Sequence, residues 1–350
     1  MAAGPSPAVS ILVAVHNGER FIAETVDSAL AQSFEDLELV VVDDGSTDAT
    51  AEILAAYAEA DRRVRVHRQA HTGVSAARNR GIEACRGPLI ALLDGDDVMK
   101  PDRLRTQLRF LAENPDAGLV GGQVDVVDED GRKFAEAAYP CDDAGIREGL
   151  QRSNAFVHSA VTVRTEVLRG VGGYRHLFVV AQDLDLWLRI AERSRLANLP
   201  QKVVSYRIHS TQASTTKIEL QATMALAARE SARRREQGLE DPIDGLAAID
   251  ERTLLAAGIA GEEIDREVVE AAVWIAKTAG RAGYEDMARE LFAIARRRAR
   301  KSSQPGSLLA TIWGAQAQRL REQGRPLRAL PLSLAARVRA RGERGRRSGR

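Results

Sequence analysis

Continuous apolar runs alternate with segments of helical apolar spacing along the first hundred positions of the chain. Runs without polar alternation are typical of strands that are buried on both faces of a sheet. These runs are residues 9–15, 37–42 and 88–93, and residues 64–67 are predicted to be a further short strand. The segments with helical spacing are residues 21–30, 53–57 and 74–84. Strands that alternate with helices favour right-handed crossover connections, so the pattern predicts an α/β fold with a parallel, doubly wound sheet.

The pattern is more mixed between residues 101 and 207. Here it predicts a helix from near Pro101 that ends before Asn114-Pro115, and a turn at Asp130-Gly131. The other predicted elements are a strand at 119–127, a strand at 161–164, a helix at 183–195 and extended structure at 201–207.

Only helical periodicities remain after about Ile218, in a segment rich in Ala and Arg. Three apolar stripes are present. They are Ile264, Val268, Ala272, Ile275 and Ala276; Met287, Leu291, Phe292 and Ala295; and Leu308, Leu309, Ile312, Trp313 and Leu320. We therefore expect an α/β domain over 1–217, a helical extension over 218–324 and a basic tail over 325–350.

The charge balance depends on which segment is counted. The 350 residues carry 50 Lys and Arg against 49 Asp and Glu, which argues against a uniformly basic nucleic-acid binder. Residues 289–350 hold 17 of the basic residues and 3 of the acidic ones, which leaves 33 basic and 46 acidic residues before them. The two cysteines, Cys85 and Cys141, match neither a disulfide scaffold nor a metal motif.

Polar and acidic residues follow three of the predicted strands, at the sheet edge where open α/β folds bind ligands. They are His16-Asn17-Gly18-Glu19, Asp43-Asp44-Gly45-Ser46 and Asp94-Gly95-Asp96-Asp97. The Asp-x-Asp arrangement suits a hard divalent metal that takes its other ligands from phosphates and water. Neither a dinucleotide-binding glycine motif nor a P-loop occurs, so a metal-bound diphosphate is favoured.

Each of these segments also has a structural alternative. Asp43 to Ser46 could form a turn that caps the next helix, and Asp94 to Asp96 could be a solvated turn. Arg78 and Arg80, which could contact a diphosphate, could equally be exposed helix charges. Their joint placement at strand ends favours a functional site.

Over residues 8–214 the chain resembles an inverting glycosyltransferase of family 2. The resemblance rests on several short motifs in the family's order. They are Val9 to Asn17, Val41 to Asp48, Gly73 to Asn79, Leu92 to Asp97, Pro101 to Leu104, Gln182 to Arg189, and Tyr206 to His209. It implies a GT-A fold, which is Rossmann-like with a mostly parallel central sheet and flanking helices, here followed by the all-helical extension.

The resemblance also implies which residues bind a nucleotide-sugar donor. The backbone of Ala14, the ring of His16 and the carboxylate of Asp44 would hold a uracil base. Glu19 would support that loop, and Arg78 would contact the nucleotide.

Metal and catalytic roles follow from the same resemblance. Asp94 would lie near the ribose, and Asp96 would ligate Mg²⁺ or Mn²⁺ at the diphosphate. His209 would complete the metal site, although a structural role is the alternative. Asp183 would be the general base, with a helix N-cap as its structural alternative.

Two positions depart from the family's usual pattern, and one segment has two interpretations. His16 stands where the family usually has Tyr, and Gln182 stands where an acidic residue often precedes the base. Gly172-Gly173-Tyr174 could form a mobile acceptor loop or an ordinary turn.

The leading hypothesis is a metal-dependent enzyme that transfers sugar from a UDP-type donor to a hydroxyl of a glycan, lipid-linked or small-molecule acceptor. The alternatives are a non-catalytic sugar-nucleotide-binding or scaffold protein and a sugar-1-phosphate nucleotidyltransferase. The latter's glycine-rich loop does not match residues 16–19. We expect no nucleic-acid partner.

We expect a cytoplasmic location. The basic tail could contact anionic lipid at the inner face of the membrane or stay solvated. The helical extension could cap the acceptor site, form a homodimer surface, contact a membrane or pack on the catalytic domain.

Overall fold

The computed structural model describes residues 6–209, 217–303, 305–324, 328–329, 332–333 and 335–336. The described chain divides into two compact units. The first holds the residues up to Arg207 together with Ala232–Leu239, and the second holds Ile208–Ser231 and the residues from Glu240 onward. The predicted tail, residues 325–350, lies almost entirely outside the described residues.

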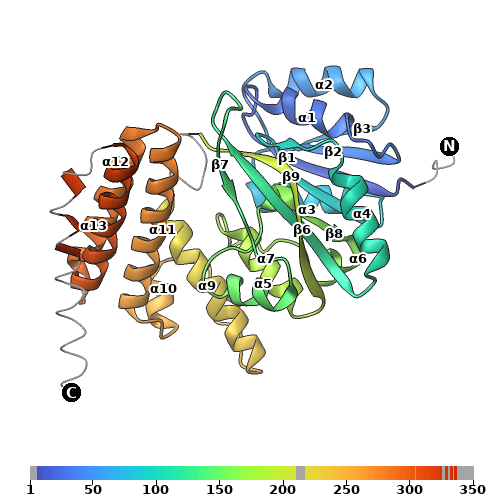
Figure 1. Cartoon of the computed structure of the whole chain (residues 1–350). Helices are drawn as coiled ribbons and strands as arrows, with labels where there is room; N and C mark the ends of the chain where they lie inside the picture. Colours follow the sequence, from blue (N-terminus) through green and yellow to red (C-terminus); the bar gives the residue numbers. More distant parts are fainter. Residues whose placement is uncertain are drawn as a thin grey trace. The chain divides into compact units, whose positions relative to one another are not determined.

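The first unit is built on one sheet with the strand order β3-β2-β1-β4-β8-β6-β9-β5, and β7 pairs with β6 (Figure 1). The strands are β1 (Val9–Val15), β2 (Leu37–Asp43), β3 (Val64–Arg68), β4 (Leu89–Asp94), β5 (Val98–Met99), β6 (Ala117–Val127), β7 (Lys133–Ala137), β8 (Thr162–Arg164) and β9 (Arg195–Arg207). The four strands predicted in the first hundred residues are β1 to β4.

Strand direction changes halfway across the sheet. β3, β2, β1 and β4 are parallel, as the alternation with helices predicts. β8 then pairs antiparallel with both β4 and β6, while β6 and β9 are parallel. The sheet is therefore mixed rather than parallel throughout, because the strand–helix alternation is lost after β4.

Helices cover both faces of the parallel half. α1 (Ile22–Leu30) and α2 (Thr50–Ala60) lie on one face, and α3 (Val74–Ala84) lies on the other. Further helices of this unit are α4 (Arg103–Glu113), α5 (Asp143–Leu150), α6 (Thr165–Gly170) and α7 (Gln182–Ala191), and a 3-10 turn, η1, spans His158–Ala160. Ile11 and Val13 of β1 share one core cluster with Val26 of α1 and Leu54 of α2. Leu12 points the other way and lies against Gly81 of α3, where no Cβ would fit.

Two boundaries differ from the predictions. The helix expected to run to residue 195 ends at Ala191, and β9 starts at Arg195 instead of near 201. Pairing of β9 with β6 begins at Ala117 and Arg195, so tertiary contacts extend the strand where the sequence pattern is weak. The pattern also missed the short β5 and the largely exposed β7.

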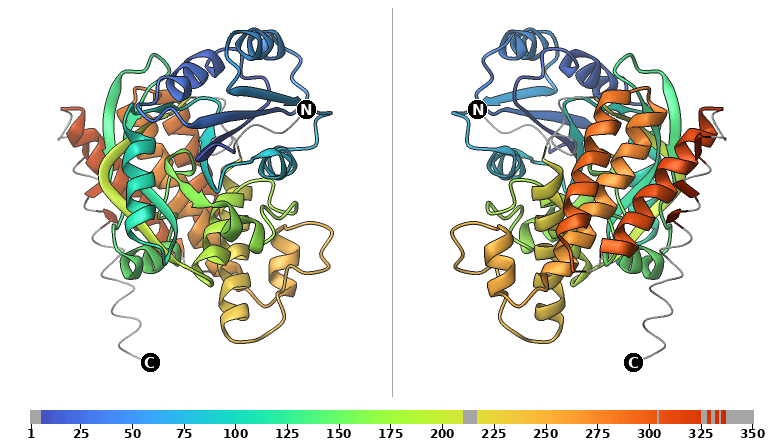
Figure 2. Two further views of the ribbon diagram at one scale, coloured as in Figure 1. Left: turned by 90° about the vertical axis from the view of Figure 1, so that its right-hand side faces the viewer. Right: turned by 90° about the vertical axis from the view of Figure 1, so that its left-hand side faces the viewer.

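The second unit is helical, as predicted. Its described helices are α9 (Ile218–Glu236), whose last residues belong to the first unit, α10 (Glu251–Ala256), α11 (Gly261–Arg281), α12 (Glu285–Lys301) and α13 (Pro305–Glu322). Helices α11, α12 and α13 lie side by side in both views of Figure 2. The predicted stripes form their common core, in which Ala272, Phe292 and Ile312 are buried.

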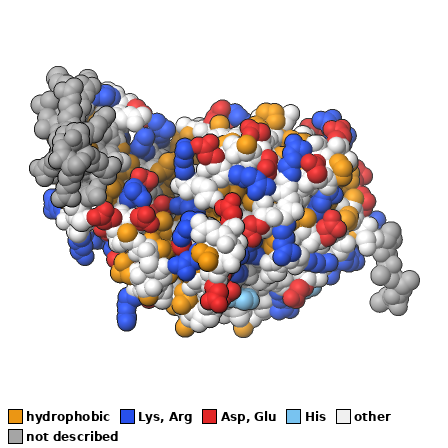
Figure 3. All heavy atoms as spheres, turned by 90° about the horizontal axis from the view of Figure 1, so that it is seen from below, with side chains coloured by type: hydrophobic (Ala, Val, Ile, Leu, Met, Phe, Trp, Pro, Cys, Tyr) orange, Lys and Arg blue, Asp and Glu red, His pale blue; other side chains and the backbone are white. Residues whose placement is uncertain are grey.

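Among the described residues, no helix is long and apolar enough to cross a bilayer. On the face drawn in Figure 3, basic and acidic side chains are interspersed among polar and hydrophobic ones. On this face the described residues therefore present no continuous field of one sign.

Candidate active site

The carboxyl ends of β1, β2 and β4 meet at one edge of the sheet. In the strand register, Ala14 of β1 lies beside Val42 of β2 on one side and Asp94 of β4 on the other. The loops after these three strands carry most of the predicted donor-binding residues. The fold therefore brings these loops together at one edge.

The loops after β1 and β2 are bonded to each other. Asn17 accepts a hydrogen bond from the Thr47 backbone N–H (2.8 Å) through its side-chain Oδ1. Glu19 Oε2 accepts from the Ala49 N–H (3.0 Å), which is a second link between the two loops. Asp43 Oδ1 accepts from the Ser46 N–H (2.9 Å) as in a turn, but neither Asp43 nor Asp44 caps α2, whose N-cap is Ala49.

Asp44 is buried beneath His16. The exposed His16 ring lies with Nδ1 2.9 Å from the Asp44 carbonyl oxygen. The Asp44 carboxylate accepts from the backbone N–H groups of Thr72 (2.9 Å) and Gly73 (2.8 Å). Burial opposes its ionisation, but these hydrogen bonds and one from Gln69 hold the pKa of Asp44 below its usual range.

Arg78 and Asp94 form an ion pair at the centre of the site. Arg78 Nη2 lies 2.6 Å from Asp94 Oδ1, and His158 Nδ1 lies 3.0 Å from the same oxygen. Burial works against both charges, but His158 and Arg78 hold the pKa of Asp94 well below its usual range. Arg78 is 6% exposed, whereas Arg80 is exposed, so only Arg80 fits the alternative of a solvated helix charge. The buried Nη1 of Arg78 has no hydrogen-bond partner among the described residues.

Three carboxylates crowd the turn after β4. Ser159 Oγ donates to Asp97 Oδ2 and also contacts Asp94 Oδ2 at 3.2 Å. Asp97 is buried, and burial together with the charges of Asp96 and Asp94 raises its pKa well above the usual range. Arg207, at the end of β9, binds this turn through the Asp96 carbonyl oxygen (2.8 Å) and Asp97 Oδ1 (2.7 Å).

The two predicted metal ligands lie in different units. Asp96 is half-buried in the turn after β4, and the buried His209 follows β9 in the second unit. Within the described ranges, no three His, Cys, Asp or Glu side chains are grouped to hold a metal ion. A metal that takes most of its ligands from a diphosphate and water needs no such group.

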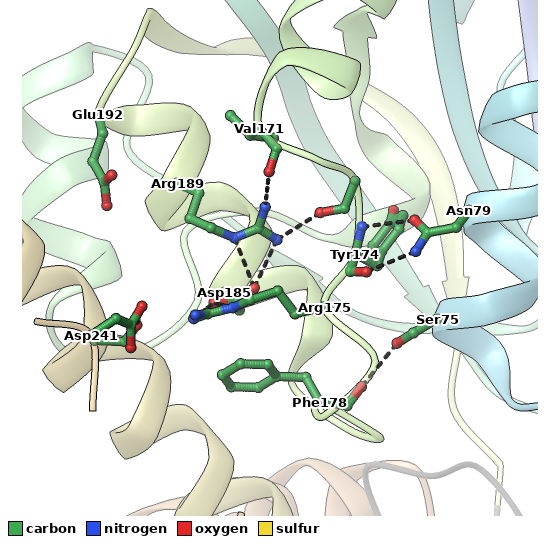
Figure 4. Close-up of polar contacts among 12 residues, drawn as sticks. Ser75, Asn79, Val171, Tyr174, Arg175, Phe178, Asp185, Arg189, Glu192 and Asp241 are labelled. Atoms are coloured by element: carbon green, nitrogen blue, oxygen red, sulfur yellow. Dashed lines mark hydrogen bonds and ion pairs between the residues drawn. The ribbon is translucent and has the colours of Figure 1, made fainter. Parts of the chain in front are cut away.

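The segment between α6 and α7, Val171–Ala181, is bonded to α3; we call it the arm (Figure 4). Asn79 Nδ2 donates a hydrogen bond to the Tyr174 carbonyl oxygen, and Asn79 Oδ1 accepts one from the Tyr174 N–H, each at 2.8 Å. Ser75 Oγ donates to the Phe178 carbonyl at 2.9 Å. Gly172 and Gly173 have positive φ, and Tyr174 is 1% exposed. The Gly172-Gly173-Tyr174 segment is therefore a turn anchored on α3.

A buried ion network holds the arm to α7 (Figure 4). Asp185 is fully buried between Arg175 of the arm (Nε to Oδ1, 3.0 Å) and Arg189 (Nη2 to Oδ2, 2.8 Å). Arg189 also donates to the carbonyl groups of Val171 (2.6 Å) and Gly173 (2.7 Å). The start of α7 is thus fixed relative to α3.

Asp183 lies in the first turn of α7. The N-cap residue is Ala181, so the alternative that Asp183 caps this helix is wrong. Its Oδ2 accepts from Asn154 Nδ2 at 2.6 Å. Burial lowers the pKa of Arg78, but Asp94 and nearby groups raise it overall, and burial raises the pKa of Tyr174. Asp183 is close enough to add to the raised pKa of both. The predicted base therefore shares the electrostatic environment of the Arg78–Asp94 pair.

Sequence reasoning missed several residues of this site. His158 Nε2 lies 2.8 Å from Tyr174 Oη, and His158 connects that tyrosine to Asp94. Asn154, Asn79 and His71 were likewise not singled out for contacts with Asp183, Tyr174 and Asp44. The His158-Ser159 pair in an apolar stretch is the one signal that could have been followed.

Comparison with known proteins gives the family. The model of glycosyl transferase family 2 matches residues 10–170. The O-antigen biosynthesis glycosyltransferase WbnJ of Escherichia coli is 32% identical over 212 residues, which are 59% of this chain and 82% of WbnJ. The chain belongs to glycosyltransferase family 2. The putative glycosyltransferase EpsE of Bacillus subtilis is also 32% identical, over 57% of this glycosyltransferase and 73% of EpsE.

Solved structures show the same fold for this family 2 glycosyltransferase. S. aureus TarS 1-349 in complex with UDP-GlcNAc matches with a TM-score of 0.53 and 16% identity, covering 89% of this chain and 88% of that one. The mannosyltransferase PcManGT of Pyrobaculum calidifontis, in complex with GDP-Man and Mn²⁺, matches with a TM-score of 0.54 and 20% identity over 96% and 87%. The predicted GT-A fold class and the predicted enzyme class are confirmed.

Proposed function

We propose that this glycosyltransferase is an inverting, metal-dependent enzyme that moves a sugar from a nucleotide-diphosphate donor, of the UDP type, to an acceptor hydroxyl. The observation that carries the proposal is the convergence of Arg78, Asp94 and Asp183 around Tyr174 at the sheet edge. Relatives of this fold bind UDP-GlcNAc and GDP-Man, which supports a nucleotide-sugar donor.

Donor binding is assigned to the loops after β1 and β2 and to α3. His16 offers an exposed ring on which a base can stack, next to the Ala14 backbone and above Asp44. The unpartnered Nη1 of the buried Arg78 can donate to an anionic or hydroxyl oxygen of the donor. Asp94 pairs with Arg78 at 2.6 Å and is the proposed neighbour of the ribose.

The residues at the turn after β4 fit a divalent cation. Asp96, Asp94 and Asp97 concentrate negative charge there, and carboxylate oxygens suit Mg²⁺ or Mn²⁺. Asp94 and Asp97 accept hydrogen bonds from the protein's own groups, and Asp96 is the proposed ligand, with His209 as the proposed second one. A bound cation would act as a Lewis acid on the charge of the leaving diphosphate.

Asp183 is the proposed general base. Its carboxylate removes the proton of the acceptor hydroxyl as that oxygen bonds to the anomeric carbon. The bond from that carbon to the diphosphate oxygen breaks with its electron pair, and the nucleoside diphosphate leaves. Because the nucleophile enters opposite the leaving group, one displacement inverts the anomeric carbon. Asn154 orients the Asp183 carboxylate through the 2.6 Å hydrogen bond.

A direct test compares two substitutions at the site with a surface control. Asp183→Asn should abolish sugar transfer and leave UDP binding intact, while Asp96→Ala should lose the Mn²⁺-dependent part of UDP binding. Asp130→Asn, at a surface turn, should change neither. Wild-type transfer by Asp183→Asn would refute the base assignment. Absence of donor hydrolysis and transfer by the wild type, with Mn²⁺ and a range of donors and acceptors, would favour the non-catalytic alternative.

Two further proposals concern the acceptor and the second unit. We propose a glycan, lipid-linked or small-molecule hydroxyl as acceptor, and helices α11 to α13 as an extension beyond the catalytic domain. Mass spectrometry of acceptor libraries tests the first proposal. Liposome co-sedimentation with and without residues 325–350 tests the proposed peripheral membrane contact, which equal binding by both forms would refute.

A further inference from the structure

His71 lies over the carboxylate and ring proposed to hold the nucleobase. It belongs to the loop between β3 and α3, and its side chain is 59% exposed. Its Nδ1 lies 2.9 Å from Asp44 Oδ2 and 3.1 Å from the Asp44 carbonyl oxygen. Its ring packs on that of His16, with 4.1 Å between the ring centroids and 30° between the planes.

His71 occupies space beside the Asp44 carboxylate that a base would need. With the proton on Nδ1, its ring N–H is bonded to the Asp44 carbonyl oxygen (3.1 Å), and the same nitrogen lies 2.9 Å from Oδ2 as an ion-pair contact. Oδ2 also accepts from the Gly73 N–H (2.8 Å), and Oδ1 accepts from Gln69 and from the backbone N–H of Thr72. With His71 in this position, the space beside Oδ2 is taken.

The backbone holds His71 at this position. Gly45 follows Asp44 with a φ of +74°, and a Cβ added there would lie 2.7 Å from the His71 backbone nitrogen. Only glycine allows the two loops to approach this closely in that conformation. The His71 side chain contacts Asp44 but is 59% exposed, so a change of its side-chain torsions moves the ring without disturbing the core.

We propose that the His71 imidazole occupies the nucleobase position of the empty enzyme and must be displaced by the donor, so that His71 sets donor affinity and selectivity. The inference rests on the proposed donor-binding roles of His16 and Asp44. The imidazole takes the place of the two contacts proposed for the base, because it stacks on His16 and its Nδ1 lies 2.9 Å from Asp44 Oδ2.

The proposal defines the class of base that can replace His71. The replacement must be flat and must offer a ring N–H to a carboxylate. Uracil and guanine carry such an N–H beside a carbonyl, whereas cytosine and adenine present an unprotonated ring nitrogen there. Displacement of His71 therefore favours uridine and guanosine diphosphates over cytidine and adenosine diphosphates.

Isothermal titration calorimetry of the full chain with UDP and Mn²⁺ tests the proposal. Removing the competing imidazole in His71→Ala should tighten UDP binding on the order of three- to tenfold. Inorganic pyrophosphate with Mn²⁺ has no base, so its affinity should be the same for the wild type and for His71→Ala. Thermal denaturation of both proteins without ligand checks that the variant is folded.

Two outcomes would overturn the proposal. The first is unchanged or weaker UDP binding by folded His71→Ala, since a wall of the pocket would be lost rather than a competitor. The second is a structure with UDP in which His71 Nδ1 stays within hydrogen-bond distance of Asp44 Oδ2. His16→Ala distinguishes failure of the proposed donor site, because that site requires weaker UDP binding whatever His71 does.

Discussion

Asn79 of α3 closes a two-bond ring with the backbone of Tyr174, a residue 95 positions later in the chain. Its Nδ2 donates to the Tyr174 carbonyl and its Oδ1 accepts from the Tyr174 N–H, both at 2.8 Å. An amide side chain can make both hydrogen bonds to one residue's backbone only when the side chain and that backbone are both held in place. The pair therefore joins the donor-side helix to the arm that leads to Asp183.

Replacing this amide should affect both stability and turnover. Asn79→Ala leaves a half-buried N–H and carbonyl without their partners and should lower the free energy of unfolding by about 2–4 kcal/mol. Transfer should fall more than UDP binding, because the arm positions Asp183 rather than the donor. Urea denaturation and steady-state kinetics measure the two effects. Arg80→Ala, on an exposed position of the same helix, is the control and should change neither.

The buried carboxylate of Asp185 should be among the most sensitive positions of the first unit. Asp185→Ala leaves Arg175 and Arg189 without their shared anion in the interior, so we expect a loss of about 3–5 kcal/mol in the free energy of unfolding. Glu192 pairs with Arg235 at 2.7 Å near the surface, and Glu192→Gln should cost less than about 1 kcal/mol. Equal losses in chemical denaturation would contradict a structural role for the buried network.

Ala181 carries backbone strain directly before α7. Its φ of 53° lies in the left-handed region, which costs a residue with a Cβ roughly 1–2 kcal/mol. Ala181→Gly should raise the free energy of unfolding by about 0.5–1 kcal/mol, after the greater entropy of the unfolded chain is subtracted. Ala181→Val should lower it, because a β-branched side chain fits this conformation poorly. A destabilised glycine variant in urea melts would argue against the strain.

Glu38 of β2 should give the protein an acid-sensitive contribution to stability far from the turn after β4. Burial opposes its charge, but Ser10, Arg65 and Arg86 bind the carboxylate and lower its pKa below 4.5. The folded protein then binds a proton on Glu38 more weakly than the unfolded chain does. The stabilisation is therefore present above the unfolded-state pKa and is lost as the pH falls through the folded-state pKa.

The corresponding measurement is denaturation at several pH values. Glu38→Gln should lower the free energy of unfolding by about 2–3 kcal/mol at pH 7, and the difference from wild type should shrink below about pH 4.5. The exposed Glu35 on the preceding loop is the control, and Glu35→Gln should change stability by less than about 0.5 kcal/mol. A pH-independent difference at Glu38 would show that its charge is not responsible.

The core strands could be predicted because the burial of each strand is visible in its own apolar residues. Most residues of β1 and β2 are apolar and all but Ala14 are buried, so long apolar runs mark both strands. β7 has no buried residue and leaves no such run. The early end of α7 depends on pairing between β9 and β6, which no local pattern contains.

The residues of the candidate site also differ in whether the sequence predicts their position. His16, Asp44 and Asp94 follow predicted strands, so topology alone places them at one edge. The contacts of His158 with Asp94 and Tyr174 join segments far apart in sequence, and they depend on a 3-10 turn without a periodic signature. Side-chain pairing of this kind follows from tertiary packing and could not be predicted from composition or spacing.

The crossed hydrogen bonds between the loops after β1 and β2 have a thermodynamic consequence. Because Asn17 and Glu19 already fix Thr47 and Ala49, a nucleotide that binds there does not have to order these loops itself. The entropic cost of association is correspondingly smaller. Cutting one of these cross-links should therefore appear in calorimetry as a less favourable binding entropy, even where the enthalpy of the donor's own contacts is unchanged.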